Sequence, residues 1–247
     1  MKNLKLTLLL LVMAVPAVFA QAKVSYGVDL WSQYHWRNGL LGGGPSIQPT
    51  ISVGVGNLTA GLWGNYTLKA LDFGEGADMD TDARELDVFA SYGLPVGPAT
   101  VSVGLTGYFT RGVASNITRF MKRANTTQPE YEMLSVYEAN LTASGPESFP
   151  LSASFNYNVA GDDADNSHYL QVSYPITAGD LTIKMIGGGT FGESAYYGTG
   201  KAALTELAVQ AAYGLKLGSL PATVTAKLAA NPYTEKFYPL VGLTITN

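Results

Sequence analysis

The sequence predicts an all-β protein: a transmembrane, antiparallel, up-and-down β-barrel of about 12 strands, preceded by a cleavable signal peptide. Three observations lead to this fold class. Apolar and polar residues alternate in segments of roughly ten residues, the length that a tilted strand needs to cross a bilayer. Short turns alternate along the chain with longer, more polar loops. Aromatic residues recur near the ends of the apolar faces, where membrane barrels carry aromatic girdles.

The composition indicates a wall of small and aromatic side chains and excludes other classes of protein. The 247 residues include 28 Gly and 15 Tyr, only 14% of them are charged, and the formal net charge is −4. Nucleic-acid-binding proteins usually carry a basic excess, so we expect no nucleic-acid partner. The absence of Cys excludes disulfides and cysteine-based metal or redox sites.

Residues 1–20 have the features of a secretory signal peptide. Two lysines precede an apolar run from Leu6 to Ala17, and Val18 and Ala20 provide small residues at a cleavage site. The run is short for a membrane span of about 20 residues, which favours cleavage over a retained anchor. The mature chain, residues 21–247, is therefore expected to form one barrel domain in the outer membrane of a Gram-negative bacterium.

The stretch Val24–Trp36 sets the pattern that later segments repeat. Every second residue from Val24 is apolar apart from one serine, and this set includes Tyr26, Tyr34 and Trp36. Because side chains of a strand alternate between two faces, these residues are predicted to face lipid. The alternate, mostly polar set from Ser25 to Arg37 is predicted to face the lumen.

Eleven later segments repeat the alternation and predict the remaining strands. Their apolar positions fall within residues 47–55, 58–68, 86–92, 101–109, 135–143, 151–159, 170–176, 181–185, 207–215, 224–230 and 237–245. Short turns are expected at 56–57, 95–98, 145–148, 177–180 and 218–221. Long loops are expected at 38–44, 70–84, 111–132, 160–167, 193–203 and 231–235. This segregation predicts turns and both termini in the periplasm, with the loops outside.

Two local features are expected to disturb the ladder of backbone hydrogen bonds. Pro49 cannot donate a backbone hydrogen bond, so we expect a bulge there. The run Gly187–Gly189 predicts a bulge or a sharp bend inside a later strand.

Part of the sequence resembles the TorF-type family of porins, which are Gram-negative barrels of poorly defined function. The residues that carry the resemblance are Ser32, Tyr34, Trp36, Arg37, Gly39, Pro45, Ile47, Gln48, Pro49, Gly61, Leu62, Trp63, Gly64, Glu85, Asp87 and Tyr92. The resemblance spans residues 24–110 and implies an outer-membrane channel of unknown substrate. Such barrels usually end in an aromatic residue that the barrel assembly machinery recognises. We expect the barrel assembly machinery to be a partner of this chain as well, although its last residue, Asn247, is not aromatic.

Charged and aromatic side chains on the polar faces are predicted to line the lumen. They are Asp29, Trp31, His35, Arg37, Trp63, Lys69, Glu85, Asp87, Glu138, Lys184, Glu206, Lys216 and Lys227. Such groups either pair with one another and hold the wall, or line a narrow pore and set its selectivity. Their mixed signs argue against strong selectivity for anions or cations.

The longest irregular segment runs from residue 111 to residue 132 and is basic. Its cations are Arg111, Arg119, Lys122 and Arg123. One hypothesis is a loop that folds into the barrel mouth and constricts it. The alternative is a solvated external loop that binds anionic lipid head groups.

No catalytic, cofactor or metal site is predicted. Aspartates at alternate positions in 78–82 have the spacing of a calcium loop but lack the Gly and Glu of an EF-hand. Weak divalent-ion binding remains an alternative there and at the acidic cluster 162–165. A lipid hydrolase would need a base beside a nucleophile, and neighbours such as Ser167 and His168 point to opposite faces of a strand.

The predicted function is a monomeric, porin-like outer-membrane channel for the passive diffusion of small polar solutes. No cofactor is expected, and outer-membrane lipids are the expected surroundings. The first alternative is a closed structural or adhesive barrel, whose lumen is plugged by Trp31, Trp63, Phe89, Tyr108 and ion pairs. The second alternative is a barrel lipid hydrolase, although we expect the protein not to be an enzyme.

Overall fold

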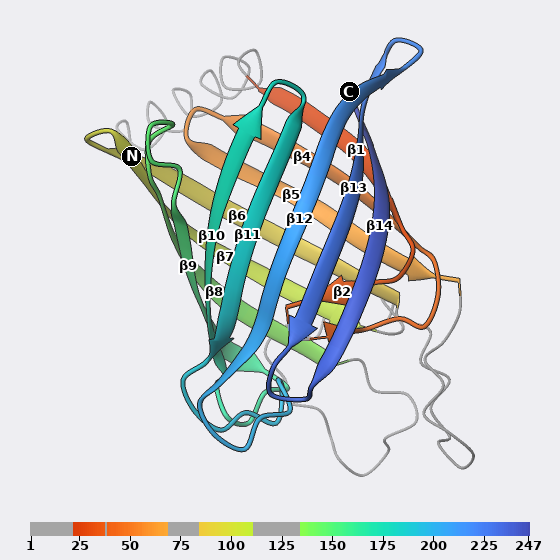
Figure 1. Ribbon diagram of the computed structural model, residues 1–247. Coiled ribbons are helices and arrows are strands. Elements are labelled where there is room, and N and C mark those ends of the chain that lie inside the picture. Colours follow the sequence, from red (N-terminus) through yellow and green to blue (C-terminus); the bar gives the residue numbers. More distant parts are fainter. Residues whose placement is uncertain (1–21, 38, 69–83, 111–133) are drawn as a thin grey trace, which may run out of the picture.

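The described part of the chain is a closed antiparallel β-barrel of twelve strands, which confirms the predicted fold class (Figure 1). This computed structural model describes residues 22–37, 39–68, 84–110 and 134–247. The predicted signal peptide, residues 1–20, lies outside the described residues. Within the described ranges, no helix is long and apolar enough to cross a membrane.

Each barrel strand pairs with the next one along the chain, and the first pairs with the last. The twelve strands are β1 (Lys23–Trp31), β4 (Ser46–Val55), β5 (Leu58–Thr67), β6 (Arg84–Val96), β7 (Ala99–Thr110), β8 (Leu134–Ser144), β9 (Ser152–Gly161), β10 (His168–Ala178), β11 (Leu181–Thr190), β12 (Ala203–Leu217), β13 (Leu220–Asn231) and β14 (Lys236–Thr246). A separate two-stranded sheet consists of β2 (His35–Trp36) and β3 (Gly39–Leu40).

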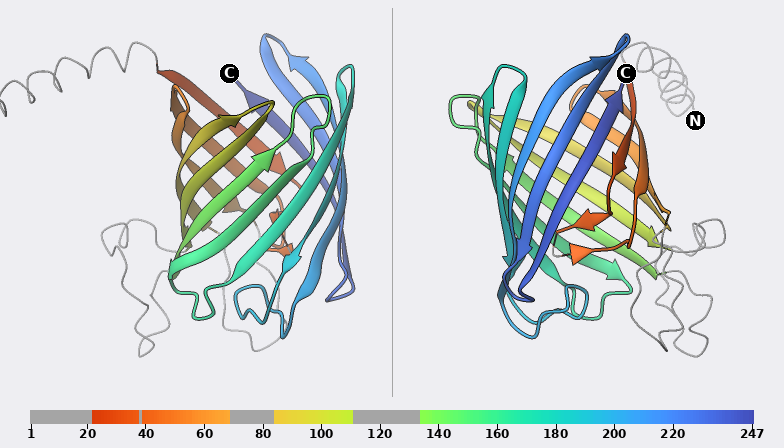
Figure 2. Two further views of the ribbon diagram at one scale, coloured as in Figure 1. Left: turned by 90° about the vertical axis from the view of Figure 1, so that its left-hand side faces the viewer. Right: turned by 45° about the vertical axis from the view of Figure 1, so that its right-hand side comes forward.

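The connections segregate by length, as the sequence predicts. Four two-residue turns each contain a glycine with positive φ: Gly56, Gly97, Gly179 and Gly218. Tight hairpin turns need such left-handed backbone conformations, because these match the twist of the two strands. These turns lie at one end of the barrel together with the start of β1 and the end of β14, and the other connections lie at the other end, apart from 145–151 (Figures 1 and 2). We call these the turn end and the loop end. The connection 145–151 lies at the turn end and is longer than the turn predicted at 145–148, so that prediction is wrong in length.

The outer face of the wall is apolar. Outward-facing side chains in the middle of strands are exposed, as Leu105 (51%) and Val209 (50%) show. Exposed aromatic residues flank them at both ends. Those at the turn end are Tyr26, Tyr92, Phe149 and Tyr213, and those at the loop end are Tyr66, Tyr157, Phe191 and Phe237. A water-soluble fold would cover so large an apolar surface.

Small residues inside the wall make room for large ones on the neighbouring strand. Trp31 pairs with Gly242 across the β1–β14 ladder, and a methyl carbon at Gly242 would lie 2.7 Å from the indole. Phe89 pairs with Gly61 in the same way, at 2.6 Å. Interior aromatic rings therefore lie flat against the wall, over positions that only glycine can occupy.

The two predicted irregularities have different outcomes. The bulge at the triple glycine is confirmed, because the β11–β12 register shifts between Gly188 and Gly189. The bulge predicted at Pro49 is wrong. Pro49 pairs with Val28 of β1, and the register with β5 is the same on both sides of it. The ring lies beside Gly64, whose missing side chain leaves it space.

The first strand is shorter than predicted. β1 ends at Trp31, where Ser32 makes the last contacts with β14: its N–H donates to Val241 O at 2.8 Å, and its hydroxyl accepts from Val241 N at 3.0 Å. The described residues 32–37 and 39–45, which we call segment 32–45, then turn into the barrel and carry β2 and β3 (Figure 2). The prediction that Tyr34 and Trp36 face lipid is therefore wrong, and Tyr34 is only 4% exposed.

The joint between β1 and β14 is short. It pairs five residues, Gly27 to Trp31, whereas β1 and β4 pair nine. The side chain of Asn247 extends it, since Oδ1 accepts from Tyr26 N at 2.9 Å and Nδ2 donates to Val24 O at 3.3 Å. The backbone N–H of Asn247 also donates to Tyr26 O at 3.2 Å, so side chain and backbone together extend the ladder at this end.

Gly188 provides a test of this interior packing. A methyl group there would overlap the ring of Tyr169, which is fully buried, whereas a methyl group at Gly187 would come no closer than 3.8 Å to a side chain. We expect Gly188→Ala to lower the free energy of unfolding by about 1–3 kcal/mol. The matched Gly187→Ala should change it by about 0.5 kcal/mol or less. Urea unfolding in detergent measures both, and equal losses would contradict the packing described.

Candidate functional site

The hairpin formed by β2 and β3 directs an arginine across the lumen. His35 pairs with Leu40 and Trp36 with Gly39, so the turn begins at Arg37. Arg37 has φ 45°, the left-handed conformation that two-residue hairpin turns require. This backbone geometry places Arg37 at the tip of the hairpin, and its side chain points away from the rest of the hairpin.

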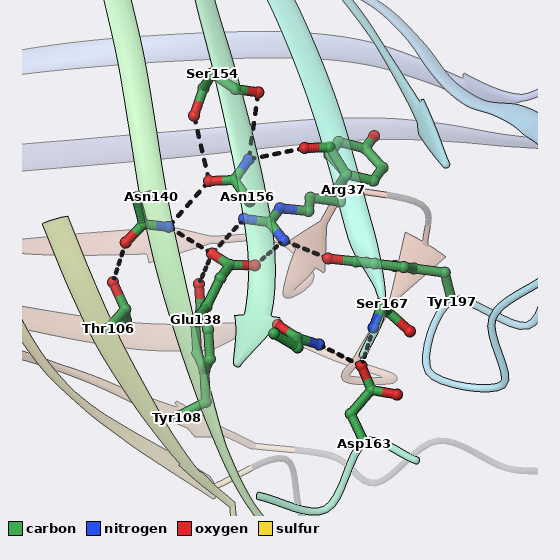
Figure 3. A network of polar contacts seen from close by, with 12 residues as sticks. Arg37, Thr106, Tyr108, Glu138, Asn140, Ser154, Asn156, Asp163, Ser167 and Tyr197 are labelled. Carbon is green, nitrogen blue, oxygen red and sulfur yellow. Dashed lines mark hydrogen bonds and ion pairs between the residues drawn. The ribbon is translucent and has the colours of Figure 1, made fainter. Parts of the chain in front are cut away.

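Arg37 forms a two-pronged ion pair with Glu138 of β8 (Figure 3). Nη1 donates to Oε2 at 2.5 Å and Nη2 donates to Oε1 at 2.8 Å. The side chains are 9% and 1% exposed. Such paired, charge-assisted hydrogen bonds fix both the distance and the plane of the two groups. Arg37 also donates to the hydroxyl of Tyr197, which the 191–202 connection brings into the lumen.

Glu138 is held in place by its own neighbours in the wall. Its Oε1 also accepts from Tyr108 OH at 2.9 Å and from Asn140 Nδ2 at 2.7 Å. Asn140 in turn accepts from Thr106 at 3.0 Å and donates to Asn156 at 3.0 Å (Figure 3). The network spans β7, β8 and β9, so the carboxylate is oriented toward the arginine by three strands at once.

Aromatic rings enclose the guanidinium. Its central carbon lies 4.3 Å from the ring centroid of Trp36, 5.0 Å from that of Tyr169 and 5.9 Å from that of Tyr197. Trp36 is stacked on Tyr197 with an interplanar angle of 24°. Cation–π contacts of this kind strengthen when water is excluded. The rings therefore shield the ion pair and fill the loop end of the lumen.

A second polar cluster contacts the other side of the hairpin. Lys227 donates to Glu206 at 2.8 Å and to Nδ1 of His35 at 3.4 Å. The His35 ring packs against Tyr238, with centroids 5.2 Å apart. Burial, and then the positive charge of Lys227, lower the pKa of His35 to about 3. His35 is therefore neutral at ordinary pH.

A third contact joins segment 32–45 to β6. Tyr34 donates from its hydroxyl to Glu85 at 2.8 Å, and its ring packs against Trp63 with centroids 5.6 Å apart. Asp87 is buried on the same strand. Together with Arg37 and His35, Tyr34 holds the segment to β6 and β8, which flank β7, and to β13, which lies on the opposite side of the barrel.

The loops above the hairpin hold Tyr197 in position. The hydroxyls of Ser167 and Ser194 are 2.6 Å apart, and Ser194 Oγ accepts from Tyr197 N at 2.9 Å. Asp163 accepts from Ser167 N at 2.6 Å and from Asn158 at 2.8 Å. The acidic loop therefore uses this carboxylate for its own structure. Among the described residues, no three His, Asp or Glu side chains are grouped as metal ligands. The aspartates within 78–82 lie outside those residues.

Among the described residues, two cavities with polar groups in their lining lie on the inner side of the wall. The smaller, of about 120 Å³, is lined chiefly by Trp31, Gln33, His35, Gln48, Gln210 and Lys227. The larger, of about 410 Å³, lies toward the turn end and is lined mainly by Ser25, Asp29, Thr50, Ser52, Thr244 and Thr246. Polar side chains thus bound the space that the barrel leaves open.

The structure brings together part of the predicted lumen set. Arg37 joins Glu138, while His35, Glu206 and Lys227 form the second cluster. Other predicted residues lie apart from these clusters: Asp29 accepts from Thr244 at 2.5 Å, Trp31 covers Gly242, Lys184 is half-buried on β11, and Lys216 is exposed at the turn end of β12. Lys69 and the four candidates for a constricting loop, Arg111, Arg119, Lys122 and Arg123, lie outside the described residues.

Sequence reasoning missed most of the aromatic and amide groups of the site. Tyr169 and Tyr197 enclose Arg37, and Asn140 and Asn156 orient its partner, but none of them was singled out for the lumen.

Fold and site together define a class of protein: a closed antiparallel barrel with an apolar outer wall, a polar lumen, and a first loop folded inward and held by a buried ion pair. The chain belongs to a family described as a bacterial protein of unknown function, Gcw_chp, whose sequence model matches residues 18–226.

A comparison with curated proteins gives no match. Among solved structures, the chain is similar to one titled "High pH structure of Pseudomonas putida OprB", with 13% sequence identity and a TM-score of 0.34. The match covers 82% of this chain and 59% of that one, so this chain spans less than two thirds of its length. The resemblance to TorF-type porins remains a prediction.

The ion pair can be tested by a double-mutant cycle. Arg37→Met leaves Glu138 charged and buried without its partner, and Glu138→Leu does the same to Arg37, so we expect each single change to lower the free energy of unfolding by about 3–5 kcal/mol. Arg37→Met combined with Glu138→Leu should lose clearly less, because no unpaired charge remains. Urea unfolding of the detergent-solubilised barrel measures both. A double variant as unstable as the sum of its single variants would show that the two groups are not coupled.

The low pKa of His35 predicts acid sensitivity. Between about pH 6.5, the ordinary pKa of His, and about pH 3, the unfolded chain binds a proton that the folded chain does not bind. Wild-type stability should therefore fall as the pH falls through this window, by at most about 1.4 kcal/mol per pH unit from this residue. Unfolding of wild type and His35→Gln at several pH values isolates the effect. If the free energy of unfolding changed with pH in the same way in both proteins, His35 would not be the source of the acid sensitivity.

Proposed function

We propose that this protein is an outer-membrane channel through which small polar solutes diffuse passively, with segment 32–45 as its constriction. One observation carries the proposal: a closed wall, apolar outside, surrounds a lumen in which two cavities are lined in part by charged, amide and hydroxyl side chains. Water and polar solutes favour such a lumen, whereas the outer face favours hydrocarbon.

The outer surface supports a membrane location. Exposed aliphatic side chains occupy the middle of the wall, and exposed aromatic side chains occur toward both ends, as at Tyr26 and Phe237. Tyr and Trp favour the two interfaces of a bilayer, and this pattern is typical of outer-membrane barrels. The short connections would then lie in the periplasm.

The interior supports a narrow and weakly selective path. Segment 32–45 crosses the loop end, and the larger cavity lies toward the turn end, on the other side of Trp31. At the loop end, charges are paired in the lumen, Arg37 with Glu138 and Lys227 with Glu206. Paired charges give a pore little preference for anions or cations. Passage would require segment 32–45 to shift or to leave a gap that admits only small molecules.

A closed barrel with a structural or adhesive role is the second candidate. The buried network around Arg37, together with the rings of Trp36 and Tyr197, favours it, because these groups fill the loop end.

We propose no enzymatic role. The His168 ring stacks on Phe191 with centroids 5.5 Å apart, and the neighbouring Ser167 hydroxyl is bonded to Ser194. His35 contacts Lys227 and Tyr238. Neither histidine is thus arranged as the base of a serine nucleophile.

Planar-bilayer recordings test the channel and its constriction together. We compare wild type with a variant in which residues 33–44 are replaced by a Gly–Ser linker of equal length. The linker should increase single-channel conductance several-fold, because the lumen widens when the aromatic rings leave it. A linker in place of 232–235, an exposed loop at the same end, is the control and should change little. Equal conductance in all three would reject the constriction, and the absence of current in all three would favour the closed barrel.

A further inference from the structure

The smaller cavity lies directly against segment 32–45 and is built from widely separated parts of the chain. Trp31 of β1, Gln48 of β4, Gln210 of β12 and Lys227 of β13 line it from the wall, and Gln33 and His35 line it from the segment. Its volume of about 120 Å³ is that of roughly four water molecules at ~30 Å³ each. A solute with about four to six heavy atoms would fill this space.

The cavity presents amide groups that are free to bind a solute. Within the described residues, the side chains of Gln33 and Gln210 have no hydrogen-bond partner. Gln48 is held from one side, since its Nε2 donates to Ser46 at 3.2 Å and to Asn65 at 3.1 Å. Each amide offers both a donor and an acceptor, and partly buried polar groups of this kind favour a ligand that completes their bonds.

The charges around the cavity cancel. Lys227 is the cation on its lining, and it is paired at 2.8 Å with Glu206. His35 faces the same lysine and is neutral, because its pKa is about 3. A charged solute would have to give up water without finding an opposite charge, which is costly in a buried site. A neutral solute avoids this cost, and the indole of Trp31 provides a surface for its C–H groups.

The larger cavity continues the polar lining toward the turn end. Along β1, Asp29 lines the larger cavity and Trp31 the smaller, and along β4, Thr50 lines the larger and Gln48 the smaller. On β4, the hydroxyls of Thr50 and Ser52 therefore lie on the turn-end side of Gln48. A solute from the turn end would meet hydroxyl groups first and amide groups next to the constriction.

We infer that the smaller cavity is a binding site for a small neutral solute with hydroxyl or amide groups, of the size of glycerol or urea. The inference rests on the proposed function, because it names the solute class of that channel. Gln33, Gln48 and Gln210 bind the polar groups of the solute, Trp31 packs against its carbon atoms, and the neutral lining rejects charged molecules of equal size.

Binding is tested by NMR on the detergent-solubilised barrel, which does not require the pore to open. Glycerol is titrated while the side-chain amide signals of Gln33 and Gln210 are followed, and lactate serves as a charged solute of similar size. Glycerol should shift these signals with saturation, and lactate should not. Gln210→Leu and Gln33→Leu should each weaken binding about three- to tenfold. Gln171→Leu is the matched control, because it makes the same change on the inner face outside the cavity.

The outcomes separate this inference from the proposed function. Saturable shifts that weaken in both cavity variants and not in Gln171→Leu support the site, even if bilayer recordings show no current. Equal shifts with lactate, or the same glycerol affinity in Gln210→Leu and Gln33→Leu as in wild type, overturn the site. In that case, currents in planar bilayers would still support the channel.

Discussion

The arrangement of the lumen depends on the buried ion pair between Arg37 and Glu138. An unpaired charge at either position would be strongly unfavourable inside the barrel, because water is largely excluded there. Side chains of β7, β8 and β9 orient Glu138 through bonds that do not involve the arginine. The wall therefore sets where the hairpin tip must lie. The left-handed backbone at Arg37 and the rings stacked around its guanidinium follow from that position.

The alternation of side chains gives the wall an outer and an inner face, and the two faces are packed in different ways. Outside, aliphatic residues form a continuous apolar surface. Inside, a twelve-stranded ring is too wide to be filled by its own wall residues, so a loop occupies the remaining space. Glycines opposite Trp31 and Phe89 let large rings lie against the wall and leave room for that loop. Where segment 32–45 does not reach, polar cavities remain.

Period-two alternation was sufficient to predict the twelve strands, their two faces and the segregation of turns from loops. The prediction failed where the chain leaves the barrel wall while apolar and polar residues continue to alternate. Tyr34 and Trp36 continue the alternation of β1, yet they belong to a segment inside the barrel. The bulge expected at Pro49 is also absent, because the strand keeps its register with both neighbours although this residue has no N–H to donate. Arg37 and Glu138 were both assigned to the lumen, but they are 101 residues apart, and no local pattern encodes their pairing.

The β1–β14 joint is a weak place in the barrel wall, because only five residue pairs form across it. Neighbouring strands elsewhere are linked by a turn at one end or by a loop at the other, whereas β1 and β14 are held by side-by-side pairing alone. The carboxamide of Asn247 behaves there like an extra peptide group and adds two hydrogen bonds beside the backbone bond from Asn247 N to Tyr26 O. An aromatic ring could not supply both of those bonds. Separation of β1 from β14 would therefore begin at the hydrogen bonds of Asn247.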